Sequence, residues 1–397
     1  MTIPKIKIGD VAQINPRPSR VPQLDEMVSF AGMTDLSAER GCITQSALRP
    51  FAEVCKGYTP FHAQDILVAK ITPCFENCKI GEASIPTDIG YGSTEFHVIR
   101  PLPARLDRRY LLHFLRQARI LNTGERRMTG SAGQRRVPAS FLEALEIPFP
   151  PLEEQRRIAA ILDKADQLLG QSRLLIKEVP SVEQSIFESL FGEFVNGSSA
   201  YPVKALEEIV KGNRIGLVRA SNECGSDLPY AYLKMDAIGK NGRLLLHKAI
   251  KTNASPEELA DYSVRDGDVL FNTRNSRELV GKTAVYRGAD EMLFNNNLMR
   301  LRFNPNTISP DFFRLFLGSR QGASELESRK SGTTSVCAIY WKNLKTMPVP
   351  LPPYELQIQL AKSLENLESL TKKYFLQEAR CNDLAKVLKS DLMSGSH

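Results

Sequence analysis

The segment Ile147-Pro148-Phe149-Pro150-Pro151-Leu152-Glu153-Glu154-Gln155 returns 202 residues later as Val349-Pro350-Leu351-Pro352-Pro353-Tyr354-Glu355-Leu356-Gln357, and each copy runs into a helical pattern. The same offset aligns Tyr110 to Leu115 with Phe312 to Leu317, and Thr129 to Ser131 with Ser331 to Thr333. A register that is kept from 110 to 155 without insertion indicates duplication. Two copies of one fold predict a pseudo-twofold molecule, which suits a ligand with two opposed sites, such as duplex DNA.

The length and composition predict a protein of two to three domains with real hydrophobic cores, since 42% of the 397 residues are hydrophobic. We find no run of eighteen apolar residues, and the segment Met1 to Lys5 lacks the apolar core of a signal peptide. The expected location is therefore the cytoplasm, without membrane contact. Seven cysteines at unpatterned spacings predict reduced thiols rather than a disulfide framework.

Positive charge is concentrated in one stretch of the chain. Between Arg100 and Arg136 ten arginines face only Asp107 and Glu125, a local excess of +8 within a total net charge of +7. The guanidinium presents its donors in a plane, which matches phosphate and guanine. A solvated helix face is the plain alternative for any single arginine, whereas the whole cluster predicts a polyanionic ligand.

The proline runs divide the chain into four segments. Residues 1–150 and 196–352 show short apolar runs and helical spacing, which predict two similar domains of mixed α and β structure. Residues 151–195 and 353–397 are predicted to be long helices, each beginning where proline ends the preceding globular domain. The predicted fold class is therefore α+β, with two globular domains and two long helices.

Apolar residues in both long helices follow alternating steps of four and three, which predicts a heptad seam. In the first helix the seam comprises Ile158, Leu162, Ala165, Leu169, Ser172, Ile176, Val179, Ile186 and Leu190, with Glu183 as a weak position. In the second it comprises Leu360, Leu364, Leu367, Thr371, Tyr374, Ala385, Leu388 and Leu392. The two helices are expected to pair with each other as an antiparallel coiled coil. Pro180 is a candidate kink.

The run Pro150-Pro151-Leu152-Glu153-Glu154-Gln155-Arg156-Arg157-Ile158-Ala159, followed by Ile161 to Asp166, closely resembles the start of the conserved helical regions in DNA specificity subunits of type I restriction-modification systems. The second copy departs at Tyr354, Leu356 and Ile358 but keeps Pro352, Pro353, Glu355 and Gln357. The resemblance identifies residues 1–150 and 196–352 as target recognition domains. It identifies residues 151–195 as the central conserved helix and 353–397 as the C-terminal one.

The resemblance also implies a function. Such a subunit has no catalytic activity or cofactor of its own, and binds a bipartite asymmetric site in double-stranded DNA. Its helices set the spacer and dock two modification subunits, which methylate adenine with S-adenosylmethionine; restriction subunits, which hydrolyse ATP and cut DNA, join them. The residues alone leave one alternative open, a non-DNA coiled-coil scaffold with two interaction domains.

Motifs of catalysis and cofactor binding are incomplete. Leu351-Pro352-Pro353-Tyr354 has leucine where amino-methylating enzymes need a polar residue, and Gly281-Lys282-Thr283 has Ser276 where a phosphate-binding loop needs its first glycine. Cys74 and Cys78 with two histidines, His62 and His97, are weak zinc candidates because no second cysteine pair exists. We therefore predict no catalytic residues and no metal site, and a third reading, a stand-alone nuclease or methyltransferase, lacks its motif.

Candidate DNA-contacting residues fall into two classes, because phosphate contacts fix register and base contacts supply sequence. The repeated small-residue loops are expected to approach phosphate, although ordinary surface turns are the alternative. Their members are Gly130, Ser131, Gln134, Arg135 and Arg136 in the first domain, and Lys330, Ser331, Gly332, Thr333 and Thr334 in the second. The base-reading candidates differ between the halves, and are Lys70, Thr72, Arg126, Arg127 and Gln134, then Arg274, Asn275, Arg277, Asn295, Asn296 and Asn297.

Overall fold

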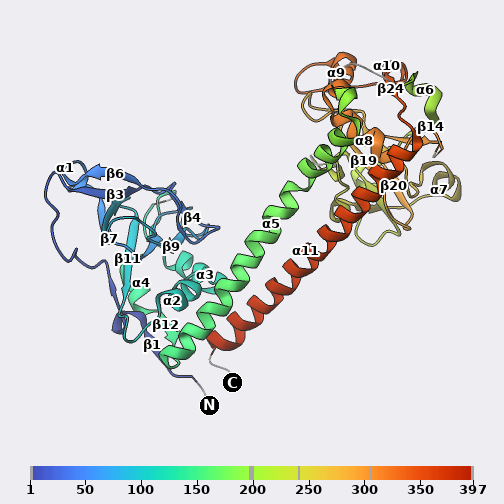
Figure 1. Cartoon of the computed structure of the whole chain (residues 1–397). Coiled ribbons are helices and arrows are strands. Elements are labelled where there is room, and N and C mark those ends of the chain that lie inside the picture. Colours follow the sequence, from blue (N-terminus) through green and yellow to red (C-terminus); the bar gives the residue numbers. More distant parts are fainter. Residues whose placement is uncertain (1–2, 132, 196–200, 240–241, 305, 395–397) are drawn as a thin grey trace. The chain divides into compact units, whose positions relative to one another are not determined.

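The computed structural model describes residues 3–131, 133–195, 201–239, 242–304 and 306–394, with side chains of the two long helices described to residues 192 and 387. The chain falls into two compact units. Unit 1 comprises Met1–Arg173 and Phe375–His397, and unit 2 comprises Leu174–Tyr374. The long helices α5 (Leu152–Val195) and α11 (Tyr354–Ser394) each contribute one half to each unit (Figure 1).

Unit 1 combines three sheets with short helices. The first sheet pairs β1 (Lys5–Lys7) with β12 (Glu146–Pro148). The second sheet has the strand order β6 (Ala47–Pro50), β3 (Met27–Ala31), β10 (Ile89–Gly92), β7 (Thr59–His62). The third sheet has the strand order β2 (Ala12–Ile14), β11 (Phe96–Pro101), β8 (Ile66–Ala69), β9 (Ile80–Glu82), β5 (Cys42–Ile43), β4 (Leu36–Ser37). The helices include α1 (Phe51–Val54), α2 (Arg108–Leu115), α3 (Ala118–Arg127) and α4 (Ala139–Ala144), and a 3-10 turn, η1 (Ile8–Asp10), follows β1.

Strand β8 lies between two hydrophobic cores of unit 1, and its side chains are apolar on both faces. Ile66 and Val68 belong to the core that α2 and α5 cover, while Leu67 and Ala69 belong to a separate core on the other face. Helix α2 starts at Asp107, whose carboxylate accepts a hydrogen bond from the Tyr110 amide. A continuous apolar run is the pattern expected of a strand that is buried on both sides.

Unit 2 has a similar arrangement with smaller main sheets. One sheet pairs β13 (Val203–Ala205) with β24 (Pro348–Pro350), and another has the strand order β14 (Val210–Ile215), β21 (Leu298–Phe303), β17 (Val269–Asn272), β19 (Thr283–Val285). A third sheet has the strand order β16 (Ile250–Thr252), β15 (Tyr230–Leu233), β20 (Met292–Phe294). A further sheet has the strand order β18 (Arg274–Asn275), β23 (Cys337–Ala338), β22 (Ser331–Gly332). The helices include α6 (Leu206–Ile209), α7 (Pro256–Tyr262), α8 (Pro310–Gly318), α9 (Arg320–Arg329) and α10 (Trp341–Leu344). Short 3-10 turns are η2 (Ser221–Glu223), η3 (Met235–Ala237) and η4 (Leu246–Lys248).

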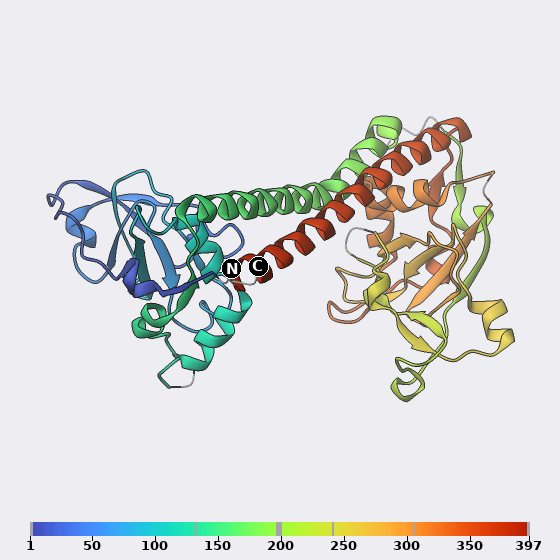
Figure 2. The ribbon, with the colours of Figure 1, turned by 90° about the horizontal axis from the view of Figure 1, so that it is seen from below.

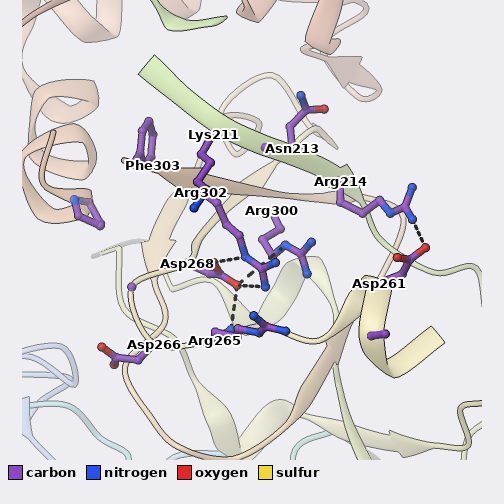
Figure 3. Close-up of a pocket in the computed structure, with 14 residues that line it drawn as sticks. Lys211, Asn213, Arg214, Asp261, Arg265, Asp266, Asp268, Arg300, Arg302 and Phe303 are labelled. Atoms are coloured by element: carbon purple, nitrogen blue, oxygen red, sulfur yellow. Dashed lines mark hydrogen bonds and ion pairs between the residues drawn. The ribbon is translucent and has the colours of Figure 1, made fainter. Parts of the chain in front are cut away.

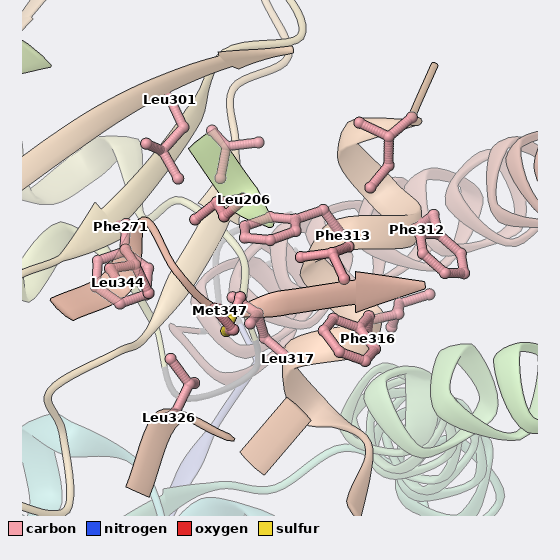
Figure 4. Close-up of a cluster of buried hydrophobic side chains, with 14 of the residues drawn as sticks. Leu206, Phe271, Leu301, Phe312, Phe313, Phe316, Leu317, Leu326, Leu344 and Met347 are labelled. Atoms are coloured by element: carbon pink, nitrogen blue, oxygen red, sulfur yellow. The ribbon is translucent and has the colours of Figure 1, made fainter. Parts of the chain in front are cut away.

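The correspondence extends to strand pairing. Strand β11 lies antiparallel between β2 and β8, as β21 lies between β14 and β17. The parallel pair of β3 with β10 returns as the parallel pair of β15 with β20. Phenylalanines of α8, including Phe312, Phe313 and Phe316, fill the main core of unit 2 (Figure 4). Phe187 and Phe191 of α5 belong to the same core. The predicted duplication of a mixed α and β fold is therefore confirmed.

The long helices run antiparallel within each unit. In unit 1 Arg173 Nε donates to Glu378 Oε1 at 3.0 Å, and Ala385 shares a core with Ile158 and Leu162. In unit 2 another core includes the pair Ile186 and Leu190 from α5 and the pair Leu360 and Leu364 from α11. The ribbons of the two helices lie side by side there (Figure 2). The residue numbers of one helix fall as those of the other rise, so the predicted antiparallel pairing is confirmed. Leu388 and Leu392 of the predicted seam lie outside the described side chains.

Two details of α5 differ from the sequence pattern. Glu183, the weak seam position, is buried because its carboxylate forms an ion pair with Arg314 of α8 at 2.8 Å. Pro180, the candidate kink, lies inside the helix, and the backbone leaves helical values at Phe191 instead. A polar seam residue thus attaches the helix to its globular domain.

None of the described helices has an apolar stretch long enough for a membrane span.

Candidate nucleic-acid interface

The repeated small-residue loops form equivalent hairpins. In the 129–136 hairpin the amides of Thr129 and Arg136 donate to each other's carbonyls at 3.0 and 2.8 Å. In the 331–338 hairpin β22 pairs with β23, so that Ser331 lies opposite Ala338. Each hairpin also pairs with the segment that follows a central strand, through Ile71 opposite Arg136 and through Arg274 opposite Ala338. The structure therefore brings the loop candidates and the candidates near 70–72 and 274–277 together in each unit.

The glycine of each hairpin is required by the backbone itself. Gly130 has a φ of +121° and Gly332 a φ of +113°. A Cβ atom would lie 2.8 Å from the Gln134 carbonyl oxygen at the first position and 2.4 Å from the Val336 carbonyl oxygen at the second. Because side chains avoid both the conformation and the contact, a bulky residue must distort either hairpin. The hairpin tips are exposed around these glycines, at Ser131, Gln134, Thr333 and Thr334.

The arginines of unit 1 divide into bound and available ones. Arg136 holds Glu95 with hydrogen bonds of 2.8, 2.9 and 3.2 Å, and this bonding lowers the pKa of Glu95. Arg135 lies 3.8 Å from the carboxylates of Glu76 and Glu125. At the end of α3 the side chains of Arg126 and Arg127 are exposed and make no hydrogen bond or ion pair with other described residues. These last two are free to meet an anion.

Lys70 and Thr72 connect the hairpin of unit 1 to its central sheet. The Lys70 carbonyl accepts from the amide of Val137, and the Thr72 amide donates to the Arg135 carbonyl. The Thr72 hydroxyl donates to Glu76 Oε1 at 3.0 Å. Both side chains are half-buried at the base of the hairpin, whereas the tip of the hairpin is exposed.

Unit 2 has fewer available cations at the equivalent place. Arg277 binds Glu327 at 2.9 Å, and Lys330 binds the same carboxylate at 2.8 Å. Arg274 is exposed and makes no side-chain hydrogen bond or ion pair among the residues the structure describes. Asn275 Oδ1 accepts from the amide of Ser276. The surface of the second hairpin is thus mainly hydroxyl-bearing, from Ser331 and the residues that follow it.

The three asparagines at 295–297 form the turn between β20 and β21. Asn295 is 7% exposed and its Oδ1 has no partner among the described residues, whereas Asn296 is exposed. The Asn297 carbonyl accepts from the amide and hydroxyl of Thr273. The turn therefore lies beside the segment that leads to Arg274, at the same end of the β17 and β21 pair.

Sequence reasoning missed the role of the glutamine that ends each copy of the proline motif. Gln155 Oε1 accepts from the Asp107 amide at 2.9 Å, and its Nε2 donates to the carbonyls of Arg105 and Pro150 at 3.1 and 2.9 Å. Gln357 repeats all three contacts, with the amide of Ser309 and the carbonyls of Thr307 and Pro352, at 2.7, 3.4 and 2.9 Å. The exposed fractions of the two side chains are 0% and 1%. We call this arrangement the glutamine clamp; its signal in the sequence was the repeated Gln itself.

In unit 1 a second contact attaches α2 to α5. Asp163 accepts from Arg109 Nη2 at 2.6 Å and contacts His113 Nε2 at 2.7 Å. Burial opposes ionisation of Asp163, but the hydrogen bonds from His113 and Arg109 outweigh it and lower its pKa to about 2. Part of the predicted arginine cluster thus serves the attachment of the helix rather than a ligand.

The weak cofactor and metal candidates are occupied by ordinary contacts. His97 Nε2 lies 2.8 Å from the Val137 carbonyl, and His62 Nε2 lies 3.2 Å from the Ser19 amide, which donates to it. Lys282 Nζ donates to the Ile238 carbonyl at 3.2 Å. Within the described part of the chain, no three His, Cys, Asp or Glu side chains are grouped as metal ligands.

Comparison with known proteins gives consistent matches along the chain. The family described as type I restriction modification DNA specificity domain matches residues 3–179 and again residues 205–377. The type I restriction enzyme EcoEI specificity subunit of Escherichia coli is 26% identical, over 91% of this chain and 77% of that protein. The EcoAI specificity subunit of Escherichia coli is 39% identical, but over 48% of this chain and only 32% of that protein.

Two solved structures share the fold. One, described as the structural basis of complex assembly and conformational transition of the type I R-M system, has a TM-score of 0.58 and 20% identity. The other, a type I restriction-modification S subunit from M. genitalium, has a TM-score of 0.59 and 15% identity. Each similarity covers 98% of this chain and 96% of the other. With its two matched domains, this chain belongs to the family of type I restriction modification DNA specificity domains.

Proposed function

We propose that this chain recognises a bipartite, asymmetric site in double-stranded DNA, with the 129–136 hairpin serving one half-site and the 331–338 hairpin the other. The observation that carries the proposal is that the two hairpins share one backbone design but present different side chains. A shared backbone suits a shared ligand, the phosphate backbone, while different side chains suit two half-sites of different sequence.

The available side chains favour different chemistry in the two units. Arg126 and Arg127 can each offer a forked pair of donors to guanine or phosphate, and Arg274 can do the same in unit 2. The exposed amide of Asn296 has the donor and acceptor that adenine matches in the major groove. We propose the remaining predicted residues of both hairpins as phosphate contacts or as their supports.

We further propose that the chain has no catalysis of its own and positions two modification subunits, with restriction subunits joining them. Support comes from large apolar side chains that the long helices expose. In the half of α11 that belongs to unit 1 they include Phe375, Leu376 and Leu384, 49%, 60% and 50% exposed. In unit 2 they include Leu174 and Leu370, 60% and 50% exposed. Exposed apolar groups of this size are typical of protein interaction surfaces.

The test is a domain exchange. Residues 1–150 are replaced by the corresponding segment of another specificity subunit, and the modified complex is assayed by sequencing of methylated DNA. Position 150 is a suitable junction because α5 begins at Leu152. We expect one half of the methylated motif to change and the other half to persist. A change in both halves would contradict independent reading by the two units.

A gel-shift titration of the unmodified chain separates this proposal from the scaffold alternative. Neutralisation of phosphates makes the logarithm of the affinity fall linearly with the logarithm of the salt concentration. A scaffold without a DNA site predicts no salt-dependent binding to any duplex. Absence of such binding, together with intact assembly of the modification subunits, would favour the scaffold.

A further inference from the structure

Unit 2 contains a basic cavity that the proposed reading surface does not use. We call it the arginine pocket; it measures about 690 Å³ and lies beside β14 and β21 (Figure 3). The strand pair β17 and β21 shows where the pocket lies relative to the proposed reading surface. Asn272 lies opposite Leu298 at one end of this pair, and Val269 lies opposite Leu301 towards the other end. Arg274 and Asn296 lie just beyond the first end of this strand pair. The pocket residues Asp268 and Arg302 lie at the second end.

The pocket contains more positive charge than its own carboxylates balance. Its charged lining comprises the five cations Lys211, Arg214, Arg265, Arg300 and Arg302 against the three carboxylates Asp261, Asp266 and Asp268. Figure 3 shows Arg300 and Arg302 beside Asp268, whose carboxylate also accepts from the Arg265 backbone amide. The excess is therefore two positive charges in a confined space.

Arg300 is the buried cation that this arrangement leaves least compensated. It is 7% exposed, and β14 places Arg214 directly opposite it, although like charges in that position destabilise a sheet. Among the described residues its side chain donates one hydrogen bond, from Nη1 to the Ser263 carbonyl at 2.5 Å, and its Nε lies 3.9 Å from Asp268. Asp268 itself is engaged by Arg302 at 2.8 and 3.0 Å.

The remaining charges do not neutralise Arg300 either. The Arg214 side chain forms an ion pair with Asp261, and Asp266 lies 3.6 Å from Arg287. The side chains of Lys211 and Arg265 are exposed and make no hydrogen bond or ion pair within the described part of the chain. Two available cations thus lie at the rim of a pocket with a buried, poorly compensated arginine in its wall.

Unit 1 shows that the fold does not require these arginines. It keeps the buried ion pair, because Arg100 binds Asp65 as Arg302 binds Asp268. At the position two residues before Arg100, however, Val98 stands where unit 2 has Arg300. The residue across the strand is Asn15, whose amide donates to the Val98 carbonyl. The two opposed arginines are therefore an addition of unit 2, and a structural role common to both units does not explain them.

We propose that the arginine pocket binds a phosphate group, supplied either by a small phosphate compound or by the backbone of a nucleic acid. Guanidinium groups bind phosphate oxygens through forked, charge-assisted hydrogen bonds. An anion between Arg214 and Arg300 removes the repulsion across the strands. Burial, followed by the charge of Arg302, lowers the pKa of Arg300 to about 10, as expected for a cation that lacks a full counter-charge.

The test uses the full chain and pyrophosphate as the free probe in isothermal titration calorimetry. The main variant is Lys211→Gln with Arg265→Gln, because both side chains are exposed and without partners, so the fold is retained. Arg320→Gln is the matched control, an exposed arginine outside the pocket. A second variant, Arg300→Val, copies the residue of unit 1 and should keep or raise the unfolding midpoint.

Two results support the proposal and distinguish the sources. If the pocket holds a free phosphate compound, pyrophosphate binds the parent chain and the control with equal affinity. Its affinity for either pocket variant is then at least about tenfold lower. If it holds a backbone phosphate, pyrophosphate fails to bind, and the double variant lowers the salt slope of duplex binding by up to about 1.8. Pocket variants that match Arg320→Gln in both measurements would overturn it. The pyrophosphate measurement needs no DNA, so its outcome is independent of the proposed function.

Discussion

Loss of the glutamine clamp should weaken unit 2 by a measurable amount. The substitution Gln357→Met keeps the length and helix propensity of the side chain but removes its contacts with Ser309, Thr307 and Pro352. The two short bonds contribute about 1 kcal/mol each, and an unsatisfied amide at Ser309 costs roughly 1–3 kcal/mol more. The expected loss in the free energy of unfolding is therefore roughly 3–5 kcal/mol.

The chain carries its own probe for this measurement. Its single tryptophan, Trp341, packs against the same core of unit 2 that includes Leu360, so fluorescence reports the unfolding of that unit. With a urea slope of about 2–3 kcal/mol per molar, the urea midpoint of unit 2 should fall by about 1–2.5 M. Gln359→Met is the matched control, since this exposed glutamine lies two positions further along the same helix. A Gln357→Met midpoint that coincides with the control would refute the clamp.

Three further predictions concern other features. Gly332→Val should weaken binding to all duplexes alike while the preference for the cognate one persists, because the hairpin is distorted but its neighbours remain; gel shifts on cognate and scrambled duplexes measure this. The double variant of Arg126 and Arg127 to Gln should lower the salt slope of duplex binding by about 1.8 if both contact phosphate, and an unchanged slope would remove them from the interface. Asp163→Asn should lower the melting temperature at pH 7. The difference in melting temperature between the variant and the parent chain should fade between about pH 4 and pH 2, because a carboxylate with a folded pKa of about 2 contributes its full stability only above that range. A difference that persists at pH 2 would contradict the ion pair.

The sequence predicted the repeated elements well because their signals are local. The proline runs end each globular domain a few residues before α5 and α11 begin, at Leu152 and Tyr354. The heptad spacing predicted which face of each helix is buried, and even the weak position at Glu183 corresponds to a real change of partner. Such features depend on residues that lie close together in the chain, so their spacing alone is informative.

The availability of the candidate side chains could not be predicted in the same way. Arg136 and Arg277 look equivalent to Arg126 in the sequence, yet Arg136 is held by Glu95 and Arg277 by Glu327, which lie 41 and 50 residues away. Only the folded chain brings these partners together. An arginine count therefore overstates the charge that a ligand meets.

The comparison of the two units separates architecture from recognition. Features that connect a domain to its helix are repeated with nearly the same geometry, as the clamps of Gln155 and Gln357 show. Exposed side chains near the hairpins differ, since the available cations there are Arg126 and Arg127 in unit 1 and Arg274 in unit 2. Two copies that bound one identical half-site would be expected to keep the same available side chains beside their hairpins. The asymmetry of the surface on a repeated framework therefore favours a ligand with two unlike halves.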